Sequence, residues 1–267
     1  MADGIPQQEI DLIMSSLPGL LDLADTDTFQ LRRVAAQVEN LWRKRAVDAV
    51  DYYTSKSFIE FGKYRRQAAI AAAENVLRLA PADVAALCNV LGMRVATLQV
   101  DAAISLIKKM AVEISDDLAT LRTLIIKAAD ILQYEMAMEL YSLIDKLSVN
   151  DAPTKYLRRP SVERSYAAMK RANMTDVDTA ERLKAAYGAL VEESYDVWRT
   201  SRNVLDDGSI LYFMHVKADA DQCALLNFSI ADRLVEQFEN PGAEVVTFLC
   251  RPLADITELS SLPMGCV

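Results

Sequence analysis

The scarcity of helix-breaking residues is the strongest constraint on what this chain can fold into. Between Pro18 and Pro153 the only proline is Pro81, and the whole chain contains eight glycines. Proline removes a backbone donor and clashes with the preceding turn, so a long stretch with a single proline can form long helices. With 52% hydrophobic residues, the 267-residue chain has enough apolar side chain for a sizeable core. The sequence therefore predicts a folded, mainly α-helical protein.

A small residue recurs at a fixed interval within this helical region. Ala69, Ala103 and Ala137 are spaced 34 residues apart, and the same shift brings Leu87 onto Leu121. A small side chain at one fixed place lets two helices approach closely, which gives a physical reason for the recurring alanine. A period of 34 residues that covers two helices is the spacing of tetratricopeptide repeats.

The residues around these alanines resemble that family. The segment RRQAAIAAAENVLRLAP (65–81) looks like the second helix of a tetratricopeptide repeat, with Ala69 and Ile70 at its close-packed start, Leu77 and Leu79 on the buried face and Pro81 at its end. The next two units carry the resemblance through Asn89, Ala103, Ile104, Ile107, Leu121, Leu124, Tyr134, Ala137 and Tyr141. The chain departs from the family pattern at Leu91 and Ile125, where glycine is usual, and at Ser115 and Val149, where proline is usual.

The resemblance covers about residues 28–150 and implies a stack of antiparallel helix pairs. Apolar residues at helical spacing predict further helices over about 28–46 and 47–62. Residues 1–26 are expected to form one or two short helices that cap the open end, since a terminal repeat has no neighbour to cover its apolar face. Residues 1–150 are thus predicted to be one helical domain, with a plain helical bundle as the alternative.

The composition changes after residue 150. Residues 151–174 contain two prolines and many basic residues and are interpreted as a solvated linker, with a docking site for an acidic partner as the alternative. A long amphipathic helix is predicted over 176–203, with Asp176 or Asp178 as its N-cap and with Tyr195 and Trp198 on its inner face. Linker and closing helix together are assigned to residues 151–204.

Residues 205–267 are predicted to form a small α/β unit. GSILYFMHV (208–216) and AEVVTFLC (243–250) are apolar runs that indicate buried strands, and the segment between them is an amphipathic helix. A strand, helix and strand in this order imply a parallel pair joined by a right-handed crossover. The fold class is therefore mainly α, a tetratricopeptide-like repeat followed by a small β-α-β unit. Because two strands alone are unstable, the unit is expected to pack on the helices, gain strands from another chain or begin a larger α/β protein.

Few residues in the chain point to chemistry. His215, the only histidine, lies within a predicted strand and is interpreted as a packed residue. Asp219 and Asp221 form a D-x-D pair that is expected to cap the following helix, and a divalent-metal site of the glycosyltransferase kind is the alternative. The four cysteines contain no C-x-x-C pair and are expected to be reduced thiols. No catalytic residue, cofactor or resident metal is predicted.

The charge and the repeat favour a protein-binding function. A net charge of −9 argues against general nucleic-acid binding, and the sequence lacks a membrane-spanning apolar run, so a cytoplasmic protein is expected. The resemblance implies an interaction scaffold whose groove presents four residues to a partner segment: Asn89, Arg122, Thr123 and Asp130. Self-association through the C-terminal strands is a further expectation. The alternative function is a glycosyltransferase-like protein with helical repeats before an α/β domain.

Overall fold

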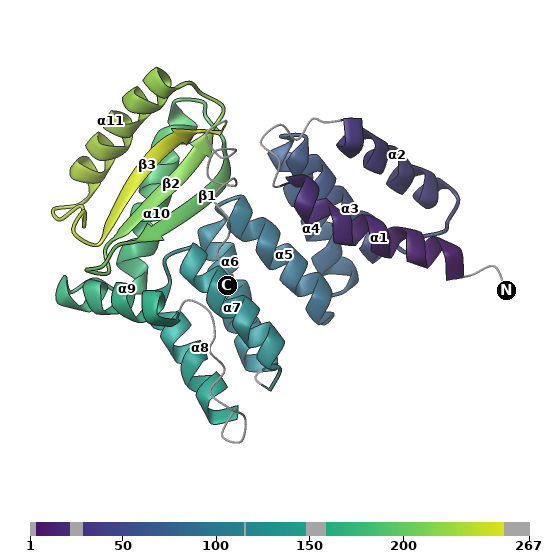
Figure 1. Cartoon of the computed structure of the whole chain (residues 1–267), viewed down its shortest axis with the longest axis horizontal. Helices are drawn as coiled ribbons and strands as arrows, with labels where there is room; N and C mark the ends of the chain where they lie inside the picture. The colour runs from purple at the N-terminus through teal and green to yellow at the C-terminus, as the bar shows by residue number, and fades with distance from the viewer. Residues whose placement is uncertain (1–3, 22–28, 115, 148–158, 254–267) are drawn as a thin grey trace. The chain divides into compact units, whose positions relative to one another are not determined.

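The computed structural model describes residues 4–21, 29–114, 116–147 and 159–253. Within these residues the protein has eleven α-helices and one three-stranded sheet, so the predicted fold class of a mainly α protein with a small β unit is confirmed (Figure 1). The chain folds into two compact units, residues 1–97 and residues 98–267. The boundary between them falls inside the segment that the sequence assigns to one helical domain.

The first unit is a set of helices that pack mainly on their neighbours in sequence. Its helices are α1 (Gly4–Leu21), α2 (Phe29–Arg43), α3 (Ala49–Gly62), α4 (Arg66–Leu79) and α5 (Val84–Ala96). Helix α3 contacts α4, α4 contacts α5, and α1 lies against α2 and α3. Asp48 and Asp83 cap α3 and α5 with their carboxylates. Trp42 stacks on Tyr52 with a centroid distance of 4.3 Å, which joins α2 to α3.

The second unit combines helix pairs with the sheet. Its helices are α6 (Val100–Glu113), α7 (Leu118–Asp130), α8 (Tyr134–Leu147), α9 (Arg159–Arg171), α10 (Asp176–Glu192) and α11 (Ala220–Gln237). Its strands are β1 (Val197–Val204), β2 (Ile210–Val216) and β3 (Val246–Pro252). Helix α7 packs on α8, α8 on α9 and α10 on α11. Among the described residues, no helix combines the length and apolarity needed to cross a membrane.

The 34-residue period appears in the structure at two kinds of position. Ala69, Ala103 and Ala137 are all fully buried, as expected for small residues at close helix contacts. The turns before the same helices contain Tyr64, Leu98 and Leu132, again 34 residues apart, with φ of 58°, 50° and 63°. A residue with left-handed backbone dihedral angles at the end of a helix lets the chain reverse its direction within a few residues. The predicted position of Leu79 on the buried face is wrong, because its side chain is exposed.

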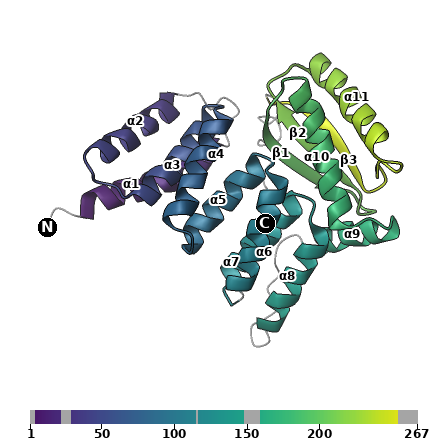
Figure 2. The same cartoon turned by 180° about the vertical axis from the view of Figure 1, so that it is seen from behind.

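The sheet has the order β1-β2-β3, with β1 antiparallel to β2 and β2 parallel to β3. The predicted parallel pair and its crossover helix α11 are therefore confirmed. Alternate residues of β3, including Val246, Phe248 and Cys250, are buried, and β3 packs against α11. Helix α10 lies across the sheet with α11 beside it (Figure 2). The third strand and the two helices give the parallel pair the neighbours that it needs for stability.

The predicted start of the closing helix at Asp176 is confirmed, but its predicted end and its predicted N-cap, Asp176 or Asp178, are wrong. Helix α10 begins after Thr175, whose side chain forms a capping box with Asp178, and it ends at Glu192 instead of residue 203. Ser194 has a positive φ of 65° and turns the chain out of the helix. Trp198 therefore belongs to strand β1, which pairs with β2. Part of the segment predicted to be a linker is instead helical, because residues 159–171 form α9. Residues 148–158 lie outside the described part of the chain.

Candidate interaction surface

The four residues predicted to line a groove lie on two helices. Asn89 is on α5 in the first unit, whereas Arg122, Thr123 and Asp130 are on α7 in the second, and all four are half-buried. The Thr123 hydroxyl donates to the carbonyl of Ala119 in its own helix at 3.1 Å. The structure thus places three of the four residues on one helix, and partner binding by them stays a prediction.

The Asp130 side chain forms ion pairs within the chain. Its carboxylate is 3.5 Å from Nε of Arg202 and 3.7 Å from Nζ of Lys127. The Arg202 side chain is almost fully buried and also donates to the Tyr134 hydroxyl at 3.4 Å. The Tyr212 hydroxyl donates to the Asp130 carbonyl at 3.0 Å, and burial raises the pKa of both Tyr134 and Tyr212. This cluster attaches strands β1 and β2 to helices α7 and α8.

The residues considered for chemistry have structural contacts. The Asp219 carboxylate caps α11 by accepting a hydrogen bond from the backbone N–H of Gln222 at 2.8 Å. This contact confirms the capping interpretation for Asp219. Asp221 lies in the first turn of α11. In the described part of the chain, no group of three or more histidine, cysteine and acidic residues is placed to hold a metal ion. His215 is buried, and its Nε2 lies 3.0 Å from the Ser201 hydroxyl on the neighbouring strand. This contact joins β1 to β2.

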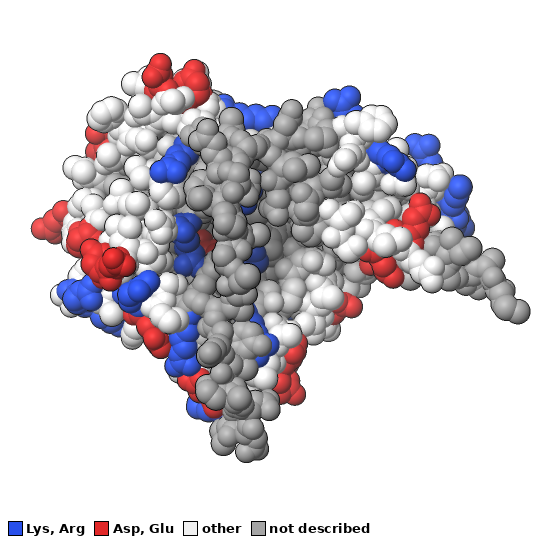
Figure 3. Space-filling view, viewed as in Figure 1, with Lys and Arg blue, Asp and Glu red and all other residues white. Residues whose placement is uncertain are grey.

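Helix α11 is apolar on two faces. Cys223, Leu226, Ile230 and Leu234 are buried. On another face, Leu225 and Phe228 are each 69% exposed and Val235 is 67% exposed. Ala224 and Ala231 are exposed as well. We call Ala224, Leu225, Phe228, Ala231 and Val235 the α11 stripe; the surface over this helix is largely uncharged in the space-filling view (Figure 3).

An acidic groove borders the stripe on the side of α10. The groove has a volume of about 370 Å³ and is lined by Ala189, Glu192, Glu193, Ser229, Asp232, Arg233 and Glu236. Its four carboxylates outnumber its single cation, and Arg233 is already paired with Glu192. Ser229, 3.5 Å from the Glu193 carboxylate, also links the two helices. The α11 stripe and this groove together make a surface that is apolar on one side and negatively charged on the other.

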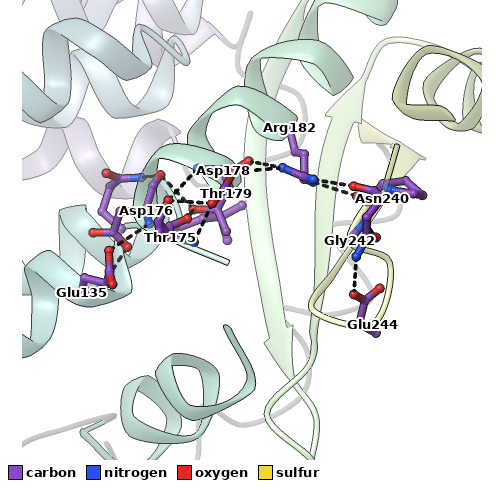
Figure 4. A network of polar contacts seen from close by, with 12 residues as sticks. Glu135, Thr175, Asp176, Asp178, Thr179, Arg182, Asn240, Gly242 and Glu244 are labelled. Atoms are coloured by element: carbon purple, nitrogen blue, oxygen red, sulfur yellow. Dashed lines mark hydrogen bonds and ion pairs between the residues drawn. The ribbon is translucent and has the colours of Figure 1, made fainter. Parts of the chain in front are cut away.

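A polar network holds the first half of α10 in place (Figure 4). The Asp176 carboxylate accepts from the backbone N–H groups of Glu135 and Met136 in α8, both at 2.9 Å. Arg182 donates to the carbonyls of Pro241 at 3.1 Å and of Asn240, in the loop between α11 and β3. Its guanidinium also lies 4.4 Å from the centroid of the Phe238 ring. The network therefore connects α10 both to the helix pair before it and to the end of α11.

The sequence interpretation identified α11 as amphipathic but missed its second apolar face. Ala224, Phe228, Ala231 and Val235 follow one another at intervals of four, three and four residues. This spacing is that of a seam between packed helices, and it was visible in the sequence. Which of the two apolar faces meets the sheet depends on the crossover and is decided only by the tertiary structure.

Comparisons with protein-family models, curated proteins and solved structures give no significant match to this chain.

Proposed function

We propose that the protein is a non-catalytic interaction adaptor that binds a partner protein through the α11 stripe and the groove beside it. The observation that carries this proposal is the exposure of Leu225, Phe228 and Val235 on one helix. Full burial of a side chain of this kind stabilises by about 1.5–3 kcal/mol relative to full exposure, and most of this gain is still open to a partner that covers these three residues. Clusters of exposed apolar residues rimmed by polar ones are typical of protein-binding surfaces.

The composition of the surface supports the same proposal. Interfaces combine an apolar centre with a polar rim, and large aromatic side chains often supply most of their binding energy. Phe228 is the aromatic residue of the stripe, and the acidic groove forms the rim on one side. Helix α10, which forms one wall of the groove, is held by the network at its start and through Arg182 near its middle.

We further propose that the helix pairs form a tetratricopeptide-like repeat that offers a second contact through Arg122 and Thr123 on α7. The recurrence of Tyr64, Leu98 and Leu132 in left-handed turns supports this interpretation, since one backbone feature returns at the interval of that family. The Sγ atoms of Cys223 and Cys250 lie 3.5 Å apart, a longer separation than the roughly 2 Å of a disulfide bond. A reduced pair suits the cytoplasm, which we propose as the compartment.

The adaptor function can be tested by affinity capture from the native source with matched variants. Phe228→Asp places a charge at the centre of the stripe, and Val112→Asp is its control, because Val112 is an 81% exposed apolar residue on α6. We expect a reproducible set of proteins to be captured by the parent and by Val112→Asp and lost with Phe228→Asp. Identical captures by all three forms would remove the stripe as the binding surface.

Self-association through the strands is a separate proposal with its own test. Strand β3 lies at an edge of the described sheet, and an edge strand can pair with another chain. Sedimentation analysis of the purified chain over a range of concentrations should then show a dimer. A monomer at all concentrations would contradict this proposal without affecting the adaptor function.

A further inference from the structure

We propose that the partner segment bound at the α11 stripe is a basic amphipathic α-helix. This inference rests on the proposed function and specifies the chemistry of the partner. It follows from the geometry of the stripe, from the sign of the charges beside it and from the arrangement of those charges on one flank.

The geometry of the stripe favours a helical partner. Ala224, Phe228, Ala231 and Val235 repeat every three or four residues and form a nearly straight ridge along an 18-residue helix. Such a helix is about 27 Å long. A second helix with apolar residues at the same intervals can pack side by side on this ridge over several turns. The small Ala224 and Ala231 leave room on either side of Phe228 for the larger residues of the partner.

The charge next to the stripe selects a basic partner. Asp232 and Glu236 project from α11, and Glu192 and Glu193 come from the end of α10, so all four acids lie on the α10 side of the stripe. Arg233 offsets one of these charges through its pair with Glu192. Lysine or arginine on one flank of the partner helix would meet the remaining carboxylates, whereas glutamate there would be repelled. The same argument disfavours an antiparallel contact with a second copy of this chain, because two α11 helices related in that way would juxtapose their acidic flanks.

Phe228 and the acids have separate roles in this contact. Phe228 would supply burial at the centre, and its loss should weaken binding at any ionic strength. The carboxylates would supply attraction and orientation, so their contribution should fall as salt is added, because exposed charges are screened. These two signatures distinguish specific docking from general attraction between a basic peptide and an acidic protein.

The test uses the full chain and two fluorescein-labelled designed peptides of about 20 residues, enough to match the length of α11. Both peptides place leucine at intervals of three and four residues; one carries lysine and arginine on its flanks, and the other carries glutamate at the same positions. Binding is measured by fluorescence anisotropy at physiological ionic strength. The parent protein and three variants are compared: Phe228→Asp, the double variant Asp232→Lys with Glu236→Lys, and the control Val112→Asp. Circular dichroism checks that each variant retains its helices.

We expect the parent and Val112→Asp to bind the basic peptide and not the acidic one. Phe228→Asp should weaken this binding at least about tenfold, which is the loss typical of replacing a residue at the centre of an interface. The double variant should bind the basic peptide more weakly by a similar factor, and it should bind the acidic peptide, which the parent does not. This exchange of partner is a readout that unfolding of the variant would not produce.

Three results would overturn the inference. The first is equal binding of both peptides by the parent, and the second is undiminished binding of the basic peptide by Phe228→Asp. The third is a dimer of the parent chain that Phe228→Asp dissociates, because the stripe would then be occupied by a second copy. If native partners are captured through Phe228 but are insensitive to the charge reversal, the adaptor function stands and the basic helix is wrong. If capture is insensitive to Phe228 as well, the proposed function at this surface fails.

Discussion

The Asp176 carboxylate at the start of α10 accepts a hydrogen bond from the backbone N–H of Met136 in the first turn of α8, at 2.9 Å. Its other oxygen accepts from the N–H of Glu135. The first N–H groups of a helix have no partner within that helix, so Asp176 caps α8 from 40 residues away in sequence. Burial raises the pKa of Asp176, and the backbone hydrogen bonds oppose this rise. One side chain therefore joins the helix pair α7–α8 to the helix that supports the acidic groove.

Replacing Asp176 by alanine should destabilise the second unit. Two buried or half-buried N–H groups would lose their acceptor, and we expect a loss of about 1–3 kcal/mol in the free energy of unfolding by urea. Asp176→Asn should lose less, because the amide oxygen can still accept one of the bonds. Asp206→Ala, at an exposed position in the β1–β2 turn, is the control. A cost no greater than that of the control would show that this cap contributes nothing to stability.

The capping box at α10 should make stability depend on pH. The pKa of Asp178 is lowered, first by the hydrogen bond from the Thr175 hydroxyl and then by that from its backbone N–H. A lowered folded-state pKa contributes stability above the unfolded value of about 3.9, and this contribution is lost as the pH falls through the folded-state value. The melting temperature of the parent should therefore exceed that of Asp178→Asn at neutral pH, and the difference should shrink below about pH 4. A difference that is constant with pH would contradict this assignment.

The recurring alanines should tolerate no larger side chain. Ala69 is fully buried, whereas its neighbour Ala68 in the same helix α4 is exposed. Ala69→Leu adds methyl groups to a filled contact and should cost about 1–3 kcal/mol in the free energy of unfolding. Ala68→Leu, measured in the same way, should be almost neutral. If the two variants unfold alike, the 34-residue register does not mark close helix contacts.

Two glycines of the second unit should respond to alanine in opposite directions. Gly208 has φ of +89°, and a Cβ there would lie 2.2 Å from the Arg164 carbonyl oxygen in α9. Gly208→Ala should therefore lower the melting temperature strongly, since both the backbone and α9 would have to shift. Gly188 lies within α10, and apart from its chain neighbours and the adjacent helix backbone no atom lies within 4 Å of an added Cβ, so Gly188→Ala should raise stability by about 0.5–1 kcal/mol. Destabilisation by Gly188→Ala would indicate that α10 is packed more tightly than the structure shows.

The buried thiols should react slowly in the folded protein. Burial raises the pKa of Cys250 strongly, and the neighbouring Cys223 adds to this shift, so little reactive thiolate is present at neutral pH. In a Cys266→Ser background, which removes a cysteine outside the described residues, a disulfide reagent should label the half-buried Cys88 first. Cys223 and Cys250 should follow only after denaturation. Labelling of all three at one rate in the native state would contradict this arrangement.

Local patterns were enough to predict much of this fold from the sequence. The scarcity of proline and glycine predicted the helices, because both residues act on the backbone of their own turn. The apolar runs at 208–216 and 243–250 predicted a parallel pair with a crossover helix, since no short turn can join parallel strands. Asp219 was recognised as a cap because an N-cap acts on residues only two or three positions away.

The tertiary structure alone decided where α10 ends and which surface is left uncovered. The apolar residues of 193–204, among them Tyr195, Val197 and Trp198, suit either a helix or a strand, and pairing with β2 selects a strand for Val197–Val204. Helix α11 has two apolar faces, and the sheet covers only one of them, so Phe228 remains in solvent. The acidic groove likewise exists only because α10 and α11 lie side by side. Helix propensity and capping act over a few residues, whereas burial depends on which surfaces meet when the whole chain has folded.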